Sequence, residues 1–230
     1  MINLARKINQ SEAVGPQVYR ILRDTIIRGG LVSGSRISEA EISKTLDTSR
    51  QPVREAFIKL SEEGLVEVRP QRGTLVTRIS PSAVRDVQFV REAIEAEVVR
   101  LLAASPDPAA VLALRGVIAR QKEVTMDRAE KFIDLDDEFH RTLAEAAGKA
   151  FAWKIIENLK VQMDRVRFMS ILQRPYEMLI RQHEAIVDAI ERGEAPAADA
   201  AVREHLRAIL GDLPEIVRAH AGLFEDADAG

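Results

Sequence analysis

The segment TSRQPVREAF (residues 48–57) places two arginines, a glutamine and two hydroxyl groups at the start of a predicted helix. Thr48 or Ser49 can cap this helix, and Pro52 falls in its first turn, where a missing N–H breaks no helical hydrogen bond. The predicted inward side consists of apolar residues at helical spacing, namely Val53, Phe57 and Leu60. The core needs none of the polar groups at the N-terminal end, so these groups are candidates for binding.

A second short helix precedes this segment. Ser38 followed by Glu41 forms a capping box and predicts a helix that starts near Glu39. That helix ends at the sequence LDTS, where Asp47 can adopt the left-handed conformation of a tight turn. An earlier amphipathic helix is stopped by the glycine pair at 29–30. Two short helices joined by a tight turn predict a helix-turn-helix.

The pattern of the sequence then changes from helical to extended. The segments LVEV (65–68) and TLVT (74–77) have strand-like composition and flank RPQRG, which contains Pro70 and Gly73. This arrangement predicts a two-stranded hairpin, the wing of a winged helix-turn-helix. We therefore expect residues 1–78 to form a winged helix-turn-helix domain.

The polar groups of the second helix have the chemistry of DNA recognition. Arg50 and Arg54 are four residues apart and share one side of the helix. In a helix-turn-helix the N-terminal part of the second helix enters the major groove, where arginine pairs with guanine and glutamine with adenine. Hydroxyl groups and backbone amides hold phosphates. The expected DNA contacts are Arg36, Thr48, Ser49, Arg50, Gln51, Arg54, Arg72 and Gly73.

Charge is distributed unevenly along the chain. Residues 1–78 contain 13 Lys and Arg against 9 Asp and Glu, whereas residues 79–230 contain 20 against 27. The positive front part is therefore the candidate for binding an anionic polymer. The absence of cysteine excludes disulfides and thiolate metal sites. No stretch approaches the roughly 18 apolar residues of a membrane span, and the first residues lack a signal-peptide pattern, so we expect a cytoplasmic protein.

The rest of the chain shows helical patterns only. After a first helix that starts near residue 82, further helices are predicted over 108–127, 128–147, 150–173, 176–192 and 196–219. A kink is expected at Pro214. We expect a mostly α fold in which an all-helical bundle of six to seven helices spans residues 79–222, followed by an acidic tail at residues 223–230.

Three of the four histidines belong to a candidate metal site. Asp136 and His140 are four residues apart and project from one helical face, while His183 and His205 lie on two later helices. Inside a bundle, one carboxylate and three imidazoles suit Zn²⁺, Ni²⁺ or Mn²⁺. Spacing alone does not distinguish this set from ordinary surface or core histidines.

The front part resembles a known family of DNA-binding domains. The sequence GSRISEAEISKTLDTSRQPVREAFIKLSEEGLVEVRPQRGTLV (34–76), and above all SRQPVREAF…L…EGLV…RG, resembles the winged helix-turn-helix of the GntR-type bacterial transcription regulators. The resemblance covers about residues 14–78. Asp47 stands where the family usually has glycine, and Ala40 stands where some members carry a further base-contacting arginine.

The back part, about residues 82–218, is similar to the all-helical FCD-type ligand-binding domain of the FadR subfamily. Metal-binding members carry Asp-x-x-Phe-His, then a histidine before an apolar helix, then a histidine in the sequence EH. The resemblance therefore implies a divalent ion, zinc first with nickel or manganese as alternatives, held by Asp136, His140, His183 and His205. It also implies a small carboxylate effector neutralised by Arg91, with Arg167 as the second candidate. His220 falls outside the pattern.

These features together predict a ligand-responsive transcription regulator, first of all a repressor, and not an enzyme. A homodimer would place two recognition helices on a palindromic operator. The alternative from another class is a metal-dependent hydrolase that uses the same Asp/His₃ site, although the sequence contains no G-x-S-x-G motif and no phosphate-binding loop. The third alternative is a DNA-binding protein whose metal is purely structural.

Overall fold

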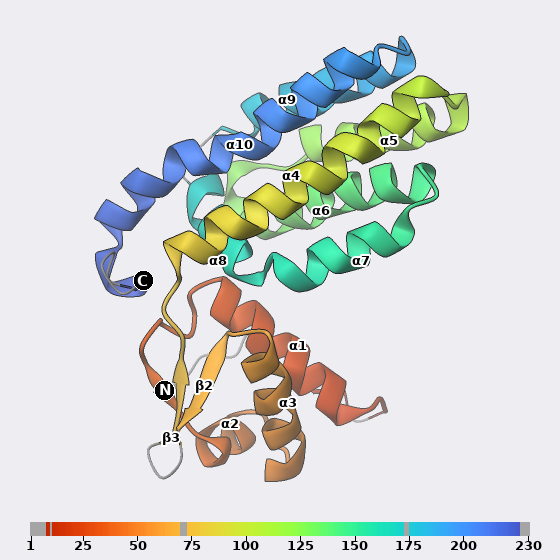
Figure 1. Ribbon diagram of the computed structural model, residues 1–230. Coiled ribbons are helices and arrows are strands. Elements are labelled where there is room, and N and C mark those ends of the chain that lie inside the picture. The colour runs from red at the N-terminus through yellow and green to blue at the C-terminus, as the bar shows by residue number, and fades with distance from the viewer. Residues whose placement is uncertain (1–7, 10, 70–72, 173–174, 226–230) are drawn as a thin grey trace. The chain divides into compact units, whose positions relative to one another are not determined.

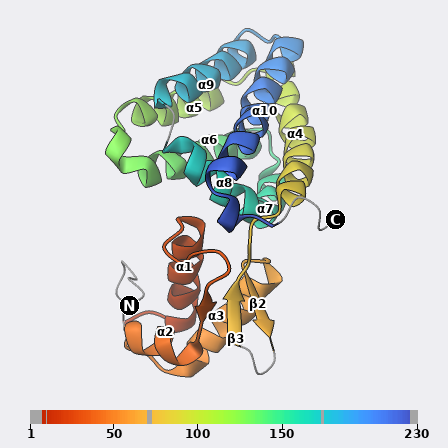
Figure 2. The same ribbon diagram turned by 90° about the vertical axis from the view of Figure 1, so that its left-hand side faces the viewer.

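The computed structural model describes most of the 230-residue chain, namely residues 8–9, 11–69, 73–172 and 175–225. The chain divides into two compact units. One consists of Met1–Ala83 together with Val217–Gly230, and the other is Val84–Ile216. Figure 1 and Figure 2 show the helices and strands of each unit from two directions.

The first unit is a winged helix-turn-helix. Its elements are α1 (Val14–Ile27), β1 (Arg36–Ile37), α2 (Glu39–Thr45), α3 (Arg50–Glu62), β2 (Val66–Arg69) and β3 (Gly73–Val76). The strands form one antiparallel sheet in the order β1-β3-β2 (Figure 1). The β2–β3 hairpin confirms the predicted wing. Strand β1 was not predicted, because two residues are too few to show an alternating pattern.

The local geometry of the helix-turn-helix follows the signals in the sequence. The backbone N–H of Glu41 donates to Ser38 Oγ at 3.1 Å, so Ser38 caps α2. Asp47 has a φ of 50°, the left-handed conformation that turns the chain between the helices. Ser49 takes the N-cap position of α3 in an extended conformation. These observations confirm the predicted start of α2, the turn and the start of α3.

Apolar side chains from the helices and the sheet form the core of the first unit. Helix α3 packs against both α1 and α2. The fully buried side chains include Val18, Leu22, Ile42, Val53, Leu60 and Leu65. Removal of these side chains from water is the main favourable term that holds the three helices together. The core lies on one side of α3 and leaves the polar residues at its N-terminal end exposed.

The second unit is a helical bundle, which confirms the predicted fold class. Its elements are α4 (Pro81–Ala104), α5 (Pro108–Lys122), the 3₁₀ turn η1 (Met126–Arg128), α6 (Ala129–Ala146), α7 (Ala150–Leu159), α8 (Val161–Ile171), α9 (Tyr176–Glu191) and α10 (Ala195–Ala219). Helix α6 lies in the middle of the bundle in both views (Figure 1, Figure 2), and its Phe132 and Phe139 are fully buried. None of the described helices combines the length and apolarity of a membrane span.

One predicted helix differs in detail from the structure. The single helix expected over 150–173 is interrupted at Lys160, which separates α7 from α8. No glycine or proline marks this break in the sequence. Pro214 lies inside α10, and the chain stays helical on both sides of it.

The end of the chain is partly structured within the first unit. After the 3₁₀ turn η2 (Ala221–Leu223), Phe224 pairs with Ile79 and is almost completely buried. The Ile79 N–H donates to Leu223 O at 2.9 Å, and the Glu225 N–H donates to Ile79 O at 3.0 Å. The expected acidic tail, residues 223–230, thus begins inside this pairing, and residues 226–230 lie outside the described part.

Candidate metal centre and nucleic-acid interface

The structure brings the predicted DNA contacts of the helix-turn-helix to the first turns of α3. Ser49, Arg50, Gln51 and Arg54 are exposed there, and Thr48 is half-buried. Hydroxyl groups, amides and guanidinium groups therefore lie together at one helix N-terminus, where phosphate and base edges are bound in DNA complexes.

The predicted contacts on the sheet also lie close to one another. Gly73 opens β3 with a φ of 88°, a conformation that favours glycine, and a Cβ built on it would lie 3.4 Å from Arg36 Cδ. Both residues are exposed. The predicted Arg72 lies outside the described residues.

Two of the exposed side chains on α3 have acidic partners. Arg54 donates from Nε to Glu39 Oε1 at 3.0 Å and from Nη2 to Glu39 Oε2 at 3.2 Å. Gln51 Nε2 donates to Glu55 Oε1 at 3.0 Å. Glu39 was not among the predicted site residues, because an acidic side chain carries no direct signal for binding a polyanion.

The candidate metal residues converge at one buried point of the second unit. Asp136 and His140 come from α6, His183 from α9 and His205 from α10, and all four are buried. One ligand atom from each lies within 4.8 Å of the others. Since Asp136 and His140 are one helical turn apart and the other two helices pack beside α6, the predicted set is brought together by the fold.

The outer ring nitrogens of the three histidines all have oxygen partners. His140 Nδ1 donates to Glu95 Oε2, His183 Nδ1 donates to Gln121 Oε1 at 2.9 Å, and His205 Nδ1 donates to Gln182 Oε1 at 3.0 Å. A donor at Nδ1 leaves Nε2 of a neutral imidazole with a lone pair and no proton. This pattern of oxygen partners is the one that orients metal-bound histidines.

The inner ring nitrogens face one another, and with the proton of each ring on Nδ1 none of them has a hydrogen to donate. His205 Nε2 lies 3.1 Å from His140 Nε2 and 3.4 Å from His183 Nε2. His183 Nε2 lies 3.3 Å from Asp136 Oδ1. Three lone pairs and a carboxylate oxygen thus point at one position, and a cation there is the arrangement that satisfies all four. The donor set therefore fits a divalent metal ion.

Burial and neighbouring charges set the protonation of this cluster. Burial lowers the pKa of His183 despite the nearby Asp136. Burial, together with the neighbouring histidines, lowers the pKa of His205 well below its ordinary value. Burial acts to raise the pKa of Asp136, but Arg167 and the histidines hold it well below its usual range. A neutral His183 and His205 beside an ionised Asp136 are the protonation states that metal binding requires.

Arg167 connects the metal candidate Asp136 to a buried group of ion pairs. Its Nη2 donates to Asp136 Oδ2, and its Nη1 donates to Asp137 at 2.9 Å and to Asp164 at 2.7 Å. Lys160 Nζ contacts the same two carboxylates at 2.6 and 2.8 Å. These pairs hold Asp136 in place and tie α6 to α8.

Arg91 is the buried guanidinium with spare hydrogen-bonding capacity. It is 5% exposed, and its Nε donates to Glu95 Oε1 at 2.5 Å. Among the described residues, no hydrogen-bond acceptor contacts Arg91 Nη2. Burial acts to raise the pKa of Glu95, but the charge of Arg91 and contacts with His140 lower it to about 2, so the carboxylate stays ionised.

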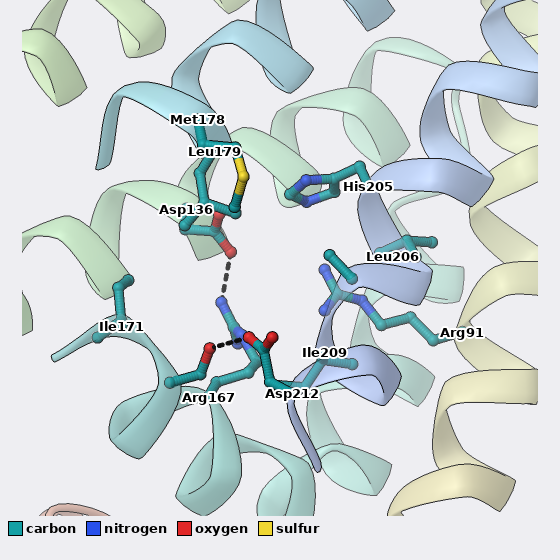
Figure 3. Close-up of a pocket in the computed structure, with 12 residues that line it drawn as sticks. Arg91, Asp136, Arg167, Ile171, Met178, Leu179, His205, Leu206, Ile209 and Asp212 are labelled. Atoms are coloured by element: carbon teal, nitrogen blue, oxygen red, sulfur yellow. Dashed lines mark hydrogen bonds and ion pairs between the residues drawn. The ribbon is translucent and has the colours of Figure 1, made fainter. Parts of the chain in front are cut away.

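A cavity of about 70 Å³ is lined by Arg91 and by two of the candidate metal residues, Asp136 and His205. Figure 3 shows the guanidinium of Arg91 pointing into it on the side of His205, while Arg167 reaches Asp136 from another side. Ser170 Oγ donates to Asp212 Oδ2 at 2.6 Å in the same pocket. The apolar wall includes Ile171, Met178, Leu179, Leu206 and Ile209. A small molecule in this pocket would meet two guanidinium groups, the carboxylate of Asp212, the candidate metal residue His205 and an apolar wall.

Comparison with protein families agrees with this architecture. Residues 15–76 match the family described as bacterial regulatory proteins, gntR family, and residues 86–208 match the FCD domain. The HTH-type transcriptional repressor RspR of Escherichia coli (strain K12) is 39% identical over 222 residues, which cover 96% of this chain and 97% of that protein. The chain belongs to the GntR family. It is a GntR-family transcription regulator with an FCD domain.

Other relatives of this GntR protein agree with that assignment. A probable D-xylose utilization operon transcriptional repressor of Paenarthrobacter nicotinovorans is 31% identical, covering 91% of this chain and 92% of that protein. A protein of Rhodococcus sp. RHA1 assigned to the GntR regulators has a similar structure, with a TM-score of 0.67 and 25% identity over 86% of this chain and 97% of that chain. The family and these relatives are transcription regulators rather than enzymes, which disfavours the hydrolase alternative.

The FCD domain also contains site residues that the sequence analysis missed. Glu95, Gln121 and Gln182 hold the outer nitrogens of the three histidines, and each lies on a different helix from the histidine that it contacts. Their positions relative to the histidines follow only from the packing of the bundle. Arg91 and Arg167, in contrast, were predicted, and the structure places both at the pocket beside the metal residues.

Proposed function

We propose that this GntR protein is a homodimeric repressor whose FCD domain binds a divalent metal ion and a small carboxylate effector, and whose α3 binds operator DNA. The observation that carries the proposal is the convergence of three imidazole lone pairs and a carboxylate beside a buried guanidinium with an unused donor. A buried cation-binding cluster next to a buried arginine suits an anionic ligand that contacts both.

Asp136, His140, His183 and His205 would hold the metal ion, with zinc as the first choice and nickel or manganese as alternatives. A bound ion would supply a Lewis acid that accepts a carboxylate oxygen of the effector. The residues of the chain position the ligands. Glu95, Gln121 and Gln182 fix the orientation of the three rings, and Arg167 holds the carboxylate of Asp136.

The cations around the cluster favour an anionic effector. In the ion-pair network of the described residues, the carboxylates of Glu95, Asp136, Asp137 and Asp164 face the cations of Arg91, Lys160 and Arg167. Asp212, which accepts from Ser170 in the same pocket, adds a further carboxylate, and a divalent ion would add two positive charges. An anionic ligand that contacts both the metal ion and Arg91 would meet two positive groups in a buried site.

Regulation requires the effector to bind one conformation of the protein better than another. The metal residues come from α6, α9 and α10, and Arg91 comes from α4. An effector that contacts the metal and Arg91 would thus link four helices of the FCD domain. We propose that this linkage changes the geometry of the dimer and lowers its affinity for the operator.

Substitution of Arg54 tests the DNA-binding part of the proposal. Arg54→Ala is expected to weaken binding to the preferred duplex by about 1–3 kcal/mol, because it removes one bidentate contact to a base. Binding to an unrelated duplex should change less. Fluorescence anisotropy with both duplexes measures the difference, and unchanged discrimination would remove Arg54 from the recognition surface.

An apolar stripe on α7 is the proposed dimer surface. Phe151, Ile155 and Leu159 are four residues apart and remain exposed, with Phe151 73% exposed. Lys154 and Glu157 flank Ile155. In a twofold interface two copies of α7 pack antiparallel, so Lys154 of one copy can face Glu157 of the other. The stripe and its flanking charges are thus self-complementary.

Ile155→Glu is expected to weaken dimerisation by roughly 10- to 100-fold, because it replaces a buried apolar contact of about 1.5–3 kcal/mol with a charge. Sedimentation equilibrium measures the dissociation constant. Leu112→Glu is the matched control, since Leu112 is a similarly apolar exposed residue on α5. Equal dissociation constants for wild type and Ile155→Glu would show that the dimer uses another surface.

A further inference from the structure

The ion pair between Glu39 and Arg54 spans the two helices of the helix-turn-helix. Glu39 is the first residue of α2, and Arg54 lies in the second turn of α3. Both carboxylate oxygens accept from the guanidinium, at 3.0 Å from Nε and 3.2 Å from Nη2. The pair is open to solvent, with side-chain exposures of 29% for Glu39 and 63% for Arg54.

The stereochemistry of the pair leaves a defined part of the guanidinium free. Nε–H and one N–H of Nη2 form the lateral donor pair of arginine, and Glu39 accepts from both. The two hydrogens of Nη1 and the second hydrogen of Nη2 remain available at the end of the side chain. The terminal donor pair of Nη1 and Nη2 matches the O6 and N7 acceptors of guanine.

A carboxylate in the first turn of α2 interacts favourably with the helix N-terminus, but that contribution does not require Glu39 to pair with Arg54. An exposed ion pair contributes about 0–1 kcal/mol to folding, and a negative charge close to DNA opposes phosphate binding. An ion pair that restricts the guanidinium has another effect. It orders the Arg54 side chain before DNA binds, so less conformational entropy is lost on binding. Among the described residues, Arg50 on the same side of α3 has no ion-pair partner, so this restriction applies to Arg54 and not to its neighbour.

We propose that Glu39 is a specificity-determining positioning residue. It holds Arg54 by the lateral donor pair so that the terminal donor pair faces a guanine in the major groove. This inference rests on the proposed function, in which Arg54 contacts a base. Arg50, without such a partner, is left to contact the phosphate backbone.

The test compares discrimination rather than affinity alone. A preferred duplex is first selected from a randomised pool with the wild-type protein. Its dissociation constant and that of a scrambled duplex are then measured for Glu39→Gln at one fixed salt concentration. Discrimination is the dissociation constant for the scrambled duplex divided by that for the preferred duplex. We expect this ratio to fall by roughly 2- to 10-fold in Glu39→Gln, the effect of releasing one long side chain. Binding to the scrambled duplex should stay equal or become tighter.

A modified base and a matched variant separate orientation from charge. Replacing the contacted guanine by 7-deazaguanine removes the N7 acceptor, and it should weaken the wild type more than Glu39→Gln. Glu41→Gln removes a charge from the same exposed helix but leaves Arg54 paired, so it should not reduce discrimination. A loss of discrimination in Glu41→Gln as large as in Glu39→Gln would overturn the inference.

The Arg54→Ala background distinguishes failure of this inference from failure of the proposed function. If Arg54→Ala lowers discrimination and Glu39→Gln has no further effect in that background, the inference is supported. If Arg54→Ala lowers discrimination but Glu39→Gln alone does not, Glu39 is no positioning residue and the proposed role of Arg54 stands. If Arg54→Ala has no effect, the role of Arg54 and the inference both fail.

Discussion

His183→Ala is expected to remove most of the bound metal from the purified protein without unfolding the bundle. Removing a residue that hydrogen-bonds to a metal ligand typically weakens metal binding by roughly 10- to 100-fold. His183→Ala removes a ligand itself, so the loss in metal affinity should be larger. The helical content should change little, since the neighbouring core of α6 and α9 remains. Elemental analysis of the purified variant and circular dichroism check the two parts of this result.

The chain provides both a control and a spectroscopic reporter for this experiment. His220→Ala should leave metal content unchanged, because His220 lies outside the cluster. The single tryptophan, Trp153, is stacked with His140 at 6.4 Å between ring centroids. Mn²⁺ or Ni²⁺ added to metal-free protein should therefore quench its fluorescence, and His183→Ala should require much more metal. Full metal occupancy in His183→Ala would exclude His183 as a ligand.

Arg91→Gln is expected to weaken carboxylate binding by about 2–5 kcal/mol, the cost of truncating one partner of a buried charge pair. The amide cannot reproduce the charge or the two parallel donors that a guanidinium offers a carboxylate. Metal content should stay near that of wild type, since Arg91 contacts Glu95 and no metal candidate. Isothermal titration with a panel of monocarboxylates, hydroxy acids and sugar acids measures the loss.

Two further variants keep the Arg91 prediction decisive. Arg91→Lys retains the positive charge that pairs with Glu95, so this variant should fold even if Arg91→Gln does not. It should still bind carboxylates more weakly than wild type. Arg115→Gln, an exposed ion-paired arginine on α5, should leave binding unchanged. Wild-type affinity for the same acid in both Arg91 variants would show that the effector does not contact this residue.

Much of the fold follows from local signals in the sequence. The capping box at Ser38, the left-handed Asp47 and the helix start at Ser49 each act within a few residues, and all three occur as predicted. Strand β1 depends on pairing with β3, which lies far along the chain, so no local pattern predicted it. The break at Lys160 likewise has no local signal. Its ammonium is buried against Asp164, four residues away, and against Asp137 of α6, a contact that only the packed bundle provides.

The candidate sites show the same division between local and tertiary information. Asp136 and His140 could be paired from their spacing, because one helical turn separates them. That His183 and His205 join them depends on how α9 and α10 pack beside α6. Arg167 was predicted as an effector contact, whereas the structure shows its guanidinium in ion pairs with Asp136, Asp137 and Asp164. Asp136 and Asp137 are far in sequence from Arg167, so these two pairs required the fold, whereas Asp164 is only three residues away on α8.

The most direct test of the account is the affinity of the dimer for its selected duplex. It is measured under three conditions: with metal alone, with metal and each carboxylate of the panel, and with chelator and each carboxylate. The account predicts that at least one carboxylate changes the dissociation constant about 5- to 150-fold, the usual range of such coupling, only when metal is present and only with Arg91 intact. Equal affinity for the selected and scrambled duplexes under every condition would contradict it.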